Sequence, residues 1–204
     1  MKKRHVLIIV GLAIVLSIGG VWSYFTDTVQ VKNTVQTGIV EIFVDEYEKT
    51  EDGGEKPYED PKTIVPGDEL SKIVKITNEE QSAYIRAKVE FEFEREELNG
   101  SIGVEDLTGI DEKKWVYKNG YFYYRDPVDS KGQITLFEGV SIPEEWGNEY
   151  ANCKLYIYVT AEAVQSANME PNYEAEDPWN GVKAEVCAYP KKERGEIRRD
   201  SEEK

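Results

Sequence analysis

The sequence contains a single histidine, His5, among its 204 residues. Histidine is the usual general base of Ser-His-Asp and Cys-His enzymes, and it supplies the ligands of the His-x-x-x-His zinc site of common metalloproteases. His5 lies in a short N-terminal segment that differs in composition from the rest of the chain. The remaining residues therefore cannot build the usual hydrolytic sites.

Carboxylates are the most abundant chemical groups, with 40 Asp and Glu against 25 Lys and Arg and a formal charge of -15. Two carboxylates can hydrolyse a glycosidic bond, which keeps a secreted hydrolase as an alternative, but so many acids single out no pair. Glu90, Glu92 and Glu94 lie about 7 Å apart on one face of an expected strand. We interpret them as a solvated face that prevents aggregation. The acidic charge disfavours nucleic acid as a partner.

The acidic segment 45–60 holds carboxylates that Ca²⁺ could use, but it lacks the spacing of an EF-hand loop. Together with Gly53, Gly54 and Pro57, its charge predicts a solvated loop. We expect no cofactor and no enzyme activity.

The two cysteines, Cys153 and Cys187, can make at most one disulfide. In a strand, Cys153 shares a face with apolar residues, whereas Cys187 shares one with Lys183 and Glu185. If the apolar sets face one core, the sulfurs point to opposite sides and lie outside bonding range. One disulfide and two free thiols both remain open.

An aromatic group is the best candidate for recognition. Six aromatic side chains flank Asn119-Gly120, and four of them are candidate recognition residues: Trp115, Tyr117, Tyr121 and Tyr123. If some pack inward, the others are exposed and can stack on sugar rings or on a partner protein. Alternatively, cross-strand aromatic pairs only stabilise the hairpin.

The first 23 residues have the order of a signal peptide. A basic start precedes an uncharged run at 6–18, too short for a comfortable membrane span. Val21-Trp22-Ser23 then presents small side chains at the positions that a signal peptidase accepts, so we expect cleavage between Ser23 and Tyr24. An uncleaved anchor is the alternative. Cleavage would remove His5 and change the formal charge from -15 to -18.

The remaining chain alternates apolar and polar residues with a period of two, which is typical of half-buried strands. We expect strands at 38–47, 70–77, 83–94, 133–137, 153–164 and 182–189, and a tight hairpin around Asn119-Gly120. Only 93–98 and 104–107 could form short helices. This pattern predicts an all-β fold, a jelly-roll-like antiparallel β-sandwich over residues 24–190. The charged residues 191–204 predict a disordered tail.

The new N-terminus is a candidate assembly strand. Residues 28–32 alternate strictly, and the apolar face includes Phe25, Val29, Val31 and Val35. Cleavage would free this segment to pair along an open sheet edge, either in its own domain or in a neighbour.

Several segments resemble the TasA and camelysin-like proteins, which Gram-positive bacteria export with the signal peptidase SipW. The resemblance lies in residues 19–27, 38–42, 65–70, 115–124 and 161–165. It implies a jelly-roll domain secreted to the cell surface or biofilm matrix, where relatives form fibres by donating an N-terminal strand. The chain is shorter than TasA and has the additional aromatic hairpin. Camelysin relatives carry a metalloprotease label, which the lack of histidine after Ser23 does not support.

We therefore expect an exported, non-enzymatic structural protein. Its partners would be itself or a related matrix subunit, the signal peptidase during export, and the membrane only before cleavage. The alternative is an adhesin-like module that binds carbohydrate or a surface protein through the aromatic hairpin.

Overall fold

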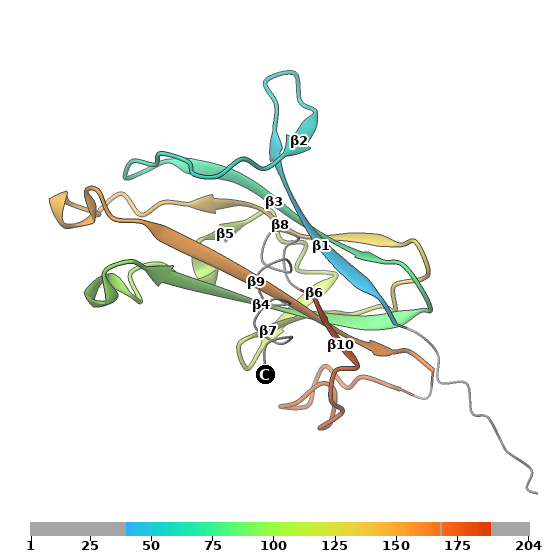
Figure 1. Ribbon diagram of the computed structural model, residues 1–204. Coiled ribbons are helices and arrows are strands. Elements are labelled where there is room, and N and C mark those ends of the chain that lie inside the picture. The colour runs from blue at the N-terminus through green and yellow to red at the C-terminus, as the bar shows by residue number, and fades with distance from the viewer. Residues whose placement is uncertain (1–39, 168, 189–204) are drawn as a thin grey trace, which may run out of the picture. The chain divides into compact units, whose positions relative to one another are not determined.

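The computed structural model describes residues 40–167 and 169–188, which all belong to the compact unit Gly38–Lys204 (Figure 1). Within these residues, two five-stranded antiparallel sheets pack face to face. The predicted antiparallel β-sandwich is thus confirmed. Helix is limited in the described part to three 3-10 turns, at Glu96–Leu98, Val104–Asp106 and Asn148–Tyr150. None of these turns has the length or apolar character needed to cross a membrane.

The first sheet has the order β2-β1-β3-β8-β5 and the second has the order β10-β9-β4-β7-β6. The strands of the first sheet are β1 (Ile42–Lys49), β2 (Glu55–Pro57), β3 (Glu69–Asn78), β5 (Leu107–Thr108) and β8 (Gln133–Ser141). Those of the second are β4 (Ala83–Phe93), β6 (Trp115–Lys118), β7 (Tyr121–Tyr124), β9 (Leu155–Gln165) and β10 (Val186–Ala188).

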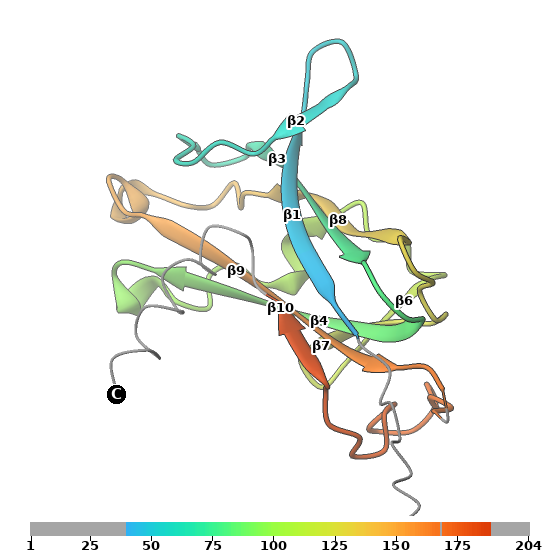
Figure 2. The ribbon, with the colours of Figure 1, turned by 45° about the vertical axis from the view of Figure 1, so that its right-hand side comes forward.

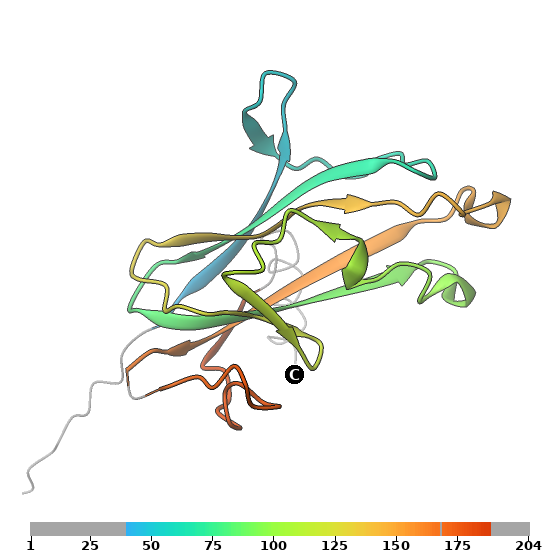
Figure 3. The same ribbon diagram turned by 180° about the vertical axis from the view of Figure 1, so that it is seen from behind.

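Two of the connections from the first sheet to the second, β3 to β4 and β8 to β9, join strands that are neighbours in both sheets. Because β3 pairs antiparallel with β8 and β4 pairs antiparallel with β9, these two crossovers lie at opposite ends of the sandwich. The orders β1-β3-β8-β5 and β10-β9-β4 correspond to the A-B-E-D and G-F-C sheets of immunoglobulin-type sandwiches. Here the β6–β7 hairpin extends the second sheet, and the view from behind brings this hairpin forward (Figure 3).

Alternation explains why β4 forms. Its odd-numbered residues from Ala83 to Phe93 face the other sheet, whereas Arg86, Lys88 and Glu90 face outward. All eleven positions of β4 pair with β9. By contrast, β10 begins at Val186 rather than at the expected residue 182, and a turn with positive φ at Asn180 and Gly181 lies before it.

The acidic segment 45–60 forms a hairpin rather than the expected loop, although its residues 51–57 are exposed (Figure 2). Strand β1 continues to Lys49, and β2 pairs back onto it. Glu48 is only 6% exposed and forms ion pairs with Lys56, at 2.8 Å, and with Lys62. Lys56 and Lys62 thus neutralise Glu48, which the local sequence alone predicts to be exposed to solvent.

A second ion pair lies beside the first. Lys72 on β3 is 4% exposed, and its Nζ lies 2.7 Å from Glu46 Oε2 on β1. The same ammonium group lies 4.0 Å from the centre of the Tyr58 ring. Burial is the main cause that raises the pKa of the Tyr58 hydroxyl, and this cluster therefore carries its charge on the lysines and glutamates.

Acid should weaken this hairpin. Hydrogen bonds from Lys56 and then Lys62 hold the pKa of Glu48 below its ordinary value. A lowered pKa in the folded state contributes stability above the unfolded value, about 4.3, and that contribution is lost as the pH falls through the folded value. Urea unfolding should therefore show a larger effect of Glu48→Gln at pH 7 than at pH 3. An equal effect at both pH values would contradict the assignment, and exposed Glu112→Gln is the matched control.

The cysteines do not form a disulfide. Cys153 is free and half-buried. In the β10–β9 register Cys187 lies opposite Glu162, nine residues beyond Cys153 along the chain. Nine extended residues span about 30 Å, far more than the roughly 4.4–6.8 Å between the Cα atoms of a disulfide.

Candidate functional site

The expected cleavage site, Ser23 and Tyr24, and the assembly-strand residues Phe25, Val29, Val31 and Val35 lie outside the described residues. The tail 191–204 also lies outside them. The structure does describe the aromatic hairpin and the edges of the two sheets.

The aromatic hairpin forms as predicted. Asn119 and Gly120 both have positive φ, 49° and 82°, as a primed two-residue turn requires. Trp115 pairs with Tyr124, and Val116 pairs with Tyr123. The aromatic side chains therefore divide between the two faces of the second sheet.

Trp115 closes a seam between the two sheets. It is 3% exposed, its ring contacts Tyr124 edge-on at 5.0 Å, and its Nε1 donates a 2.8 Å hydrogen bond to the carbonyl of Thr135. Thr135 lies on β8 beyond the short pairing with β5, which covers only Gly139 and Val140. The indole thus satisfies a carbonyl on a part of the β8 edge that no described strand pairs, and it is not available to a ligand.

Tyr121 and Tyr123 lie on the outer face of the second sheet around Arg86. The guanidinium lies 4.2 Å from the centre of the Tyr121 ring and 4.5 Å from that of Trp179. Glu162 holds it through bonds of 2.7 Å to Nε and 2.6 Å to Nη2. Tyr123 and Trp179 are buried in this cluster.

Residues 169–185 bring Trp179 onto this face. The hairpin turn holds this segment, because Lys118 Nζ donates to the carbonyl of Ala175 at 2.9 Å and Asn119 Nδ2 to that of Glu176 at 2.7 Å. Of the four candidate recognition residues, only Tyr117, at 47%, is strongly exposed, and Tyr121 is half-buried. Sequence reasoning missed Trp179, because nothing local connects it with Arg86.

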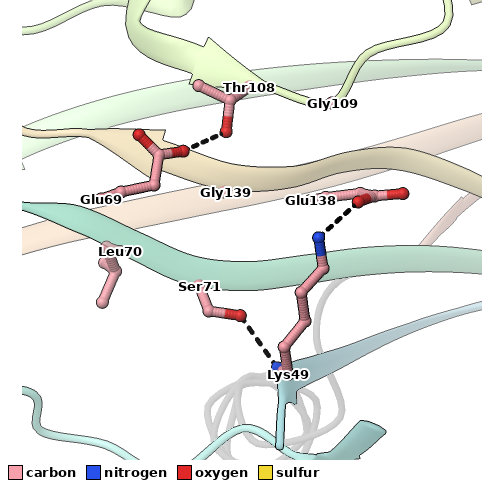
Figure 4. Close-up of a pocket in the computed structure, with 8 residues that line it drawn as sticks. All are labelled: Lys49, Glu69, Leu70, Ser71, Thr108, Gly109, Glu138 and Gly139. Carbon is pink, nitrogen blue, oxygen red and sulfur yellow. Dashed lines mark hydrogen bonds and ion pairs between the residues drawn. The ribbon is translucent and has the colours of Figure 1, made fainter. Parts of the chain in front are cut away.

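A polar pocket of about 290 Å³ lies on the outer face of the first sheet (Figure 4). Lys49 Nζ reaches Glu138 Oε2 at 2.8 Å, and Thr108 Oγ1 donates to Glu69 Oε1 at 2.5 Å. Lys49 also donates its backbone N–H to Ser71 Oγ at 2.9 Å. Lys49 and Glu138 thus neutralise each other, whereas Glu69 accepts a hydrogen bond from a neutral hydroxyl. Among the residues described, no group of His, Cys, Asp and Glu is placed to hold a metal ion.

Strand β9 has an edge that the described strands cover only in part. One side pairs with β4 at every position, but on the other side β10 covers only Ala161, Glu162 and Ala163. In the described part of the chain, residues 155–160 have no strand beside them on that side. Leu155 and Ile157 beneath this edge pack against the core but remain partly exposed. An extended segment could pair here and cover both.

No protein-family model, curated protein or solved structure matches this chain.

Proposed function

We propose that this protein is an exported, non-enzymatic structural protein of a Gram-positive cell surface or biofilm matrix. It assembles with itself or with a related subunit, by adding its N-terminal strand to the sheet of a neighbour. The single observation that carries the proposal is the edge of β9 at residues 155–160, beside which no described strand lies. The family resemblance and the expected signal peptide support export.

The open edge and the N-terminal segment match in length and pattern. Six strand residues span about 20 Å, which a segment such as 28–35 is long enough to cover. An unpaired edge presents backbone N–H and C=O groups that accept another strand. Val29 and Val31 share one face of the segment, which would lie over the partly exposed Leu155 and Ile157.

A binding module is the second candidate, and Tyr117 is the observation that favours it. At 47%, this side chain is the most exposed aromatic ring of the hairpin. Because Trp115 and Tyr123 are buried, the remaining aromatic surface is small. Assembly through the edge is therefore the better supported function.

Assembly should require both the donor segment and the acceptor edge. Deleting residues 24–32, or placing a charge under the edge with Leu155→Lys, should abolish fibres in electron micrographs while leaving a folded monomer. Tyr117→Ala is the control and should assemble normally. A protein that stays monomeric at high concentration and loses affinity for glycans on Tyr117→Ala would instead support the binding module.

A further inference from the structure

The outer face of the second sheet divides into two halves. The covered half holds Arg86 between aromatic rings and Glu162. In the other half, Tyr156 and Tyr158 of β9 lie opposite Glu92 and Glu90 of β4. The two tyrosine rings are nearly parallel, at 16°, with centroids 6.2 Å apart, and Tyr156 is 40% exposed.

The second half repeats the chemistry that holds Arg86, but no residue that the structure describes supplies a cation to Glu92. Glu90 pairs with Lys88 at 2.5 Å, and Glu94 pairs with Lys154 at 3.6 Å. Glu92 is exposed and forms no ion pair with any residue that the structure describes. A carboxylate beside aromatic faces attracts a lysine or arginine side chain through both charge and cation–π contact.

A cationic segment of the same chain follows directly. Strand β10 pairs Ala188 with Ala161 and runs antiparallel to β9. Three residues farther along each strand, this register would bring Lys191 opposite Tyr158. Residues 191–199 carry five basic and two acidic side chains, whereas the face is acidic; the basic residues are Lys191, Lys192, Arg194, Arg198 and Arg199.

We propose that residues 191–199 dock in cis on the face formed by Tyr156, Glu90 and Glu92. The tail segment is favoured over a neutral sugar for two reasons. Its charge is opposite to that of the face, and β10 runs along β9 toward this face. The docked segment would also shield the β9 edge at 155–160 until a competing strand displaces it. That last consequence alone rests on the proposed function.

Trypsin tests the docking without altering the tail. In the full-length protein, cleavage after the basic residues of 191–199 should become about fivefold faster in a Tyr156→Ser/Glu92→Lys variant, because the charge and ring contacts are lost. Glu112→Lys, which makes the same charge change at an exposed position, should leave the rate unchanged. The difference should shrink in high salt and should not depend on protein concentration.

Hydrogen exchange gives an independent readout, which does not depend on assembly. The amides of residues 155–160 should exchange faster in a Lys191→Glu/Lys192→Glu variant, and not in Lys113→Glu/Lys114→Glu. Equal trypsin rates in the face variant and its control would overturn the docking. Protection that grows with protein concentration would assign it to the tail of a second copy, and a shift on adding a neutral oligosaccharide but not a Lys/Arg peptide would assign the face to sugars. Should Tyr156→Ser/Glu92→Lys unfold the domain, Glu92→Gln provides the same comparison.

Discussion

Replacing Trp115 by alanine should lower the free energy of unfolding by about 4 kcal/mol, the usual cost of truncating a buried tryptophan. The indole is buried at the seam, packs on Tyr124 and donates its N–H to the carbonyl of Thr135. Its removal leaves a cavity and an unsatisfied carbonyl on the open edge of β8. Urea unfolding followed by circular dichroism measures the change.

Two further variants separate the contribution of the indole hydrogen bond from that of the buried ring. Trp115→Phe keeps an aromatic ring but loses the N–H, so it should cost about 1–3 kcal/mol for the stranded carbonyl together with some lost packing. Tyr117→Ala on the same strand should change stability by less than about 0.5 kcal/mol, since its side chain is largely in water. If Trp115→Ala were as stable as Tyr117→Ala, the closing role of the indole would be disproved.

Lys72→Ala should cost about 4 kcal/mol, because it leaves Glu46 with little solvent and no counter-ion. The pair lies 2.7 Å apart, and the two side chains are only 5% and 17% exposed. The change also removes the ammonium group from the face of the Tyr58 ring. Thermal or urea unfolding of the single variant gives the cost.

A double replacement distinguishes the lost charge from lost packing. Lys72→Met/Glu46→Leu removes both charges and keeps most of the apolar volume, so it should recover most of the stability that Lys72→Ala loses. Lys154→Ala, from an exposed pair with Glu94 at 3.6 Å, is the control and should cost less than about 1 kcal/mol. A double variant no more stable than Lys72→Ala would show that the ion pair itself is not the source of the effect.

The sequence predicts those elements whose cause is local. Strand β4 is recognisable because one face is apolar and the other charged, and the β6–β7 hairpin because Asn119-Gly120 tolerates positive φ. The order of the strands is not local, since nothing in β3 indicates that β8 will lie beside it. The buried Glu48 was missed for the same reason, because Lys62 reaches it from beyond the next strand.

In the candidate site, too, the contacts between residues far apart in the sequence could not be predicted. Alternation separates Trp115 from Val116 and so predicts that some aromatic residues pack inward. It does not show that Trp179, 93 positions after Arg86, covers the outer face as well. Burial of Tyr123 depends on that cover. The alternation also does not distinguish the buried Trp115 from the exposed Tyr117, which both lie on the edge strand β6.

The pairing of β4 with β9 also has a kinetic consequence. Ala83 pairs with Gln165, so the second sheet cannot form its longest ladder until nearly the whole chain has been synthesised. Domains dominated by such distant pairings fold slowly, on the order of milliseconds to seconds. A nascent chain of this topology therefore leaves β4 without its longest partner until residues 155–165 have been made.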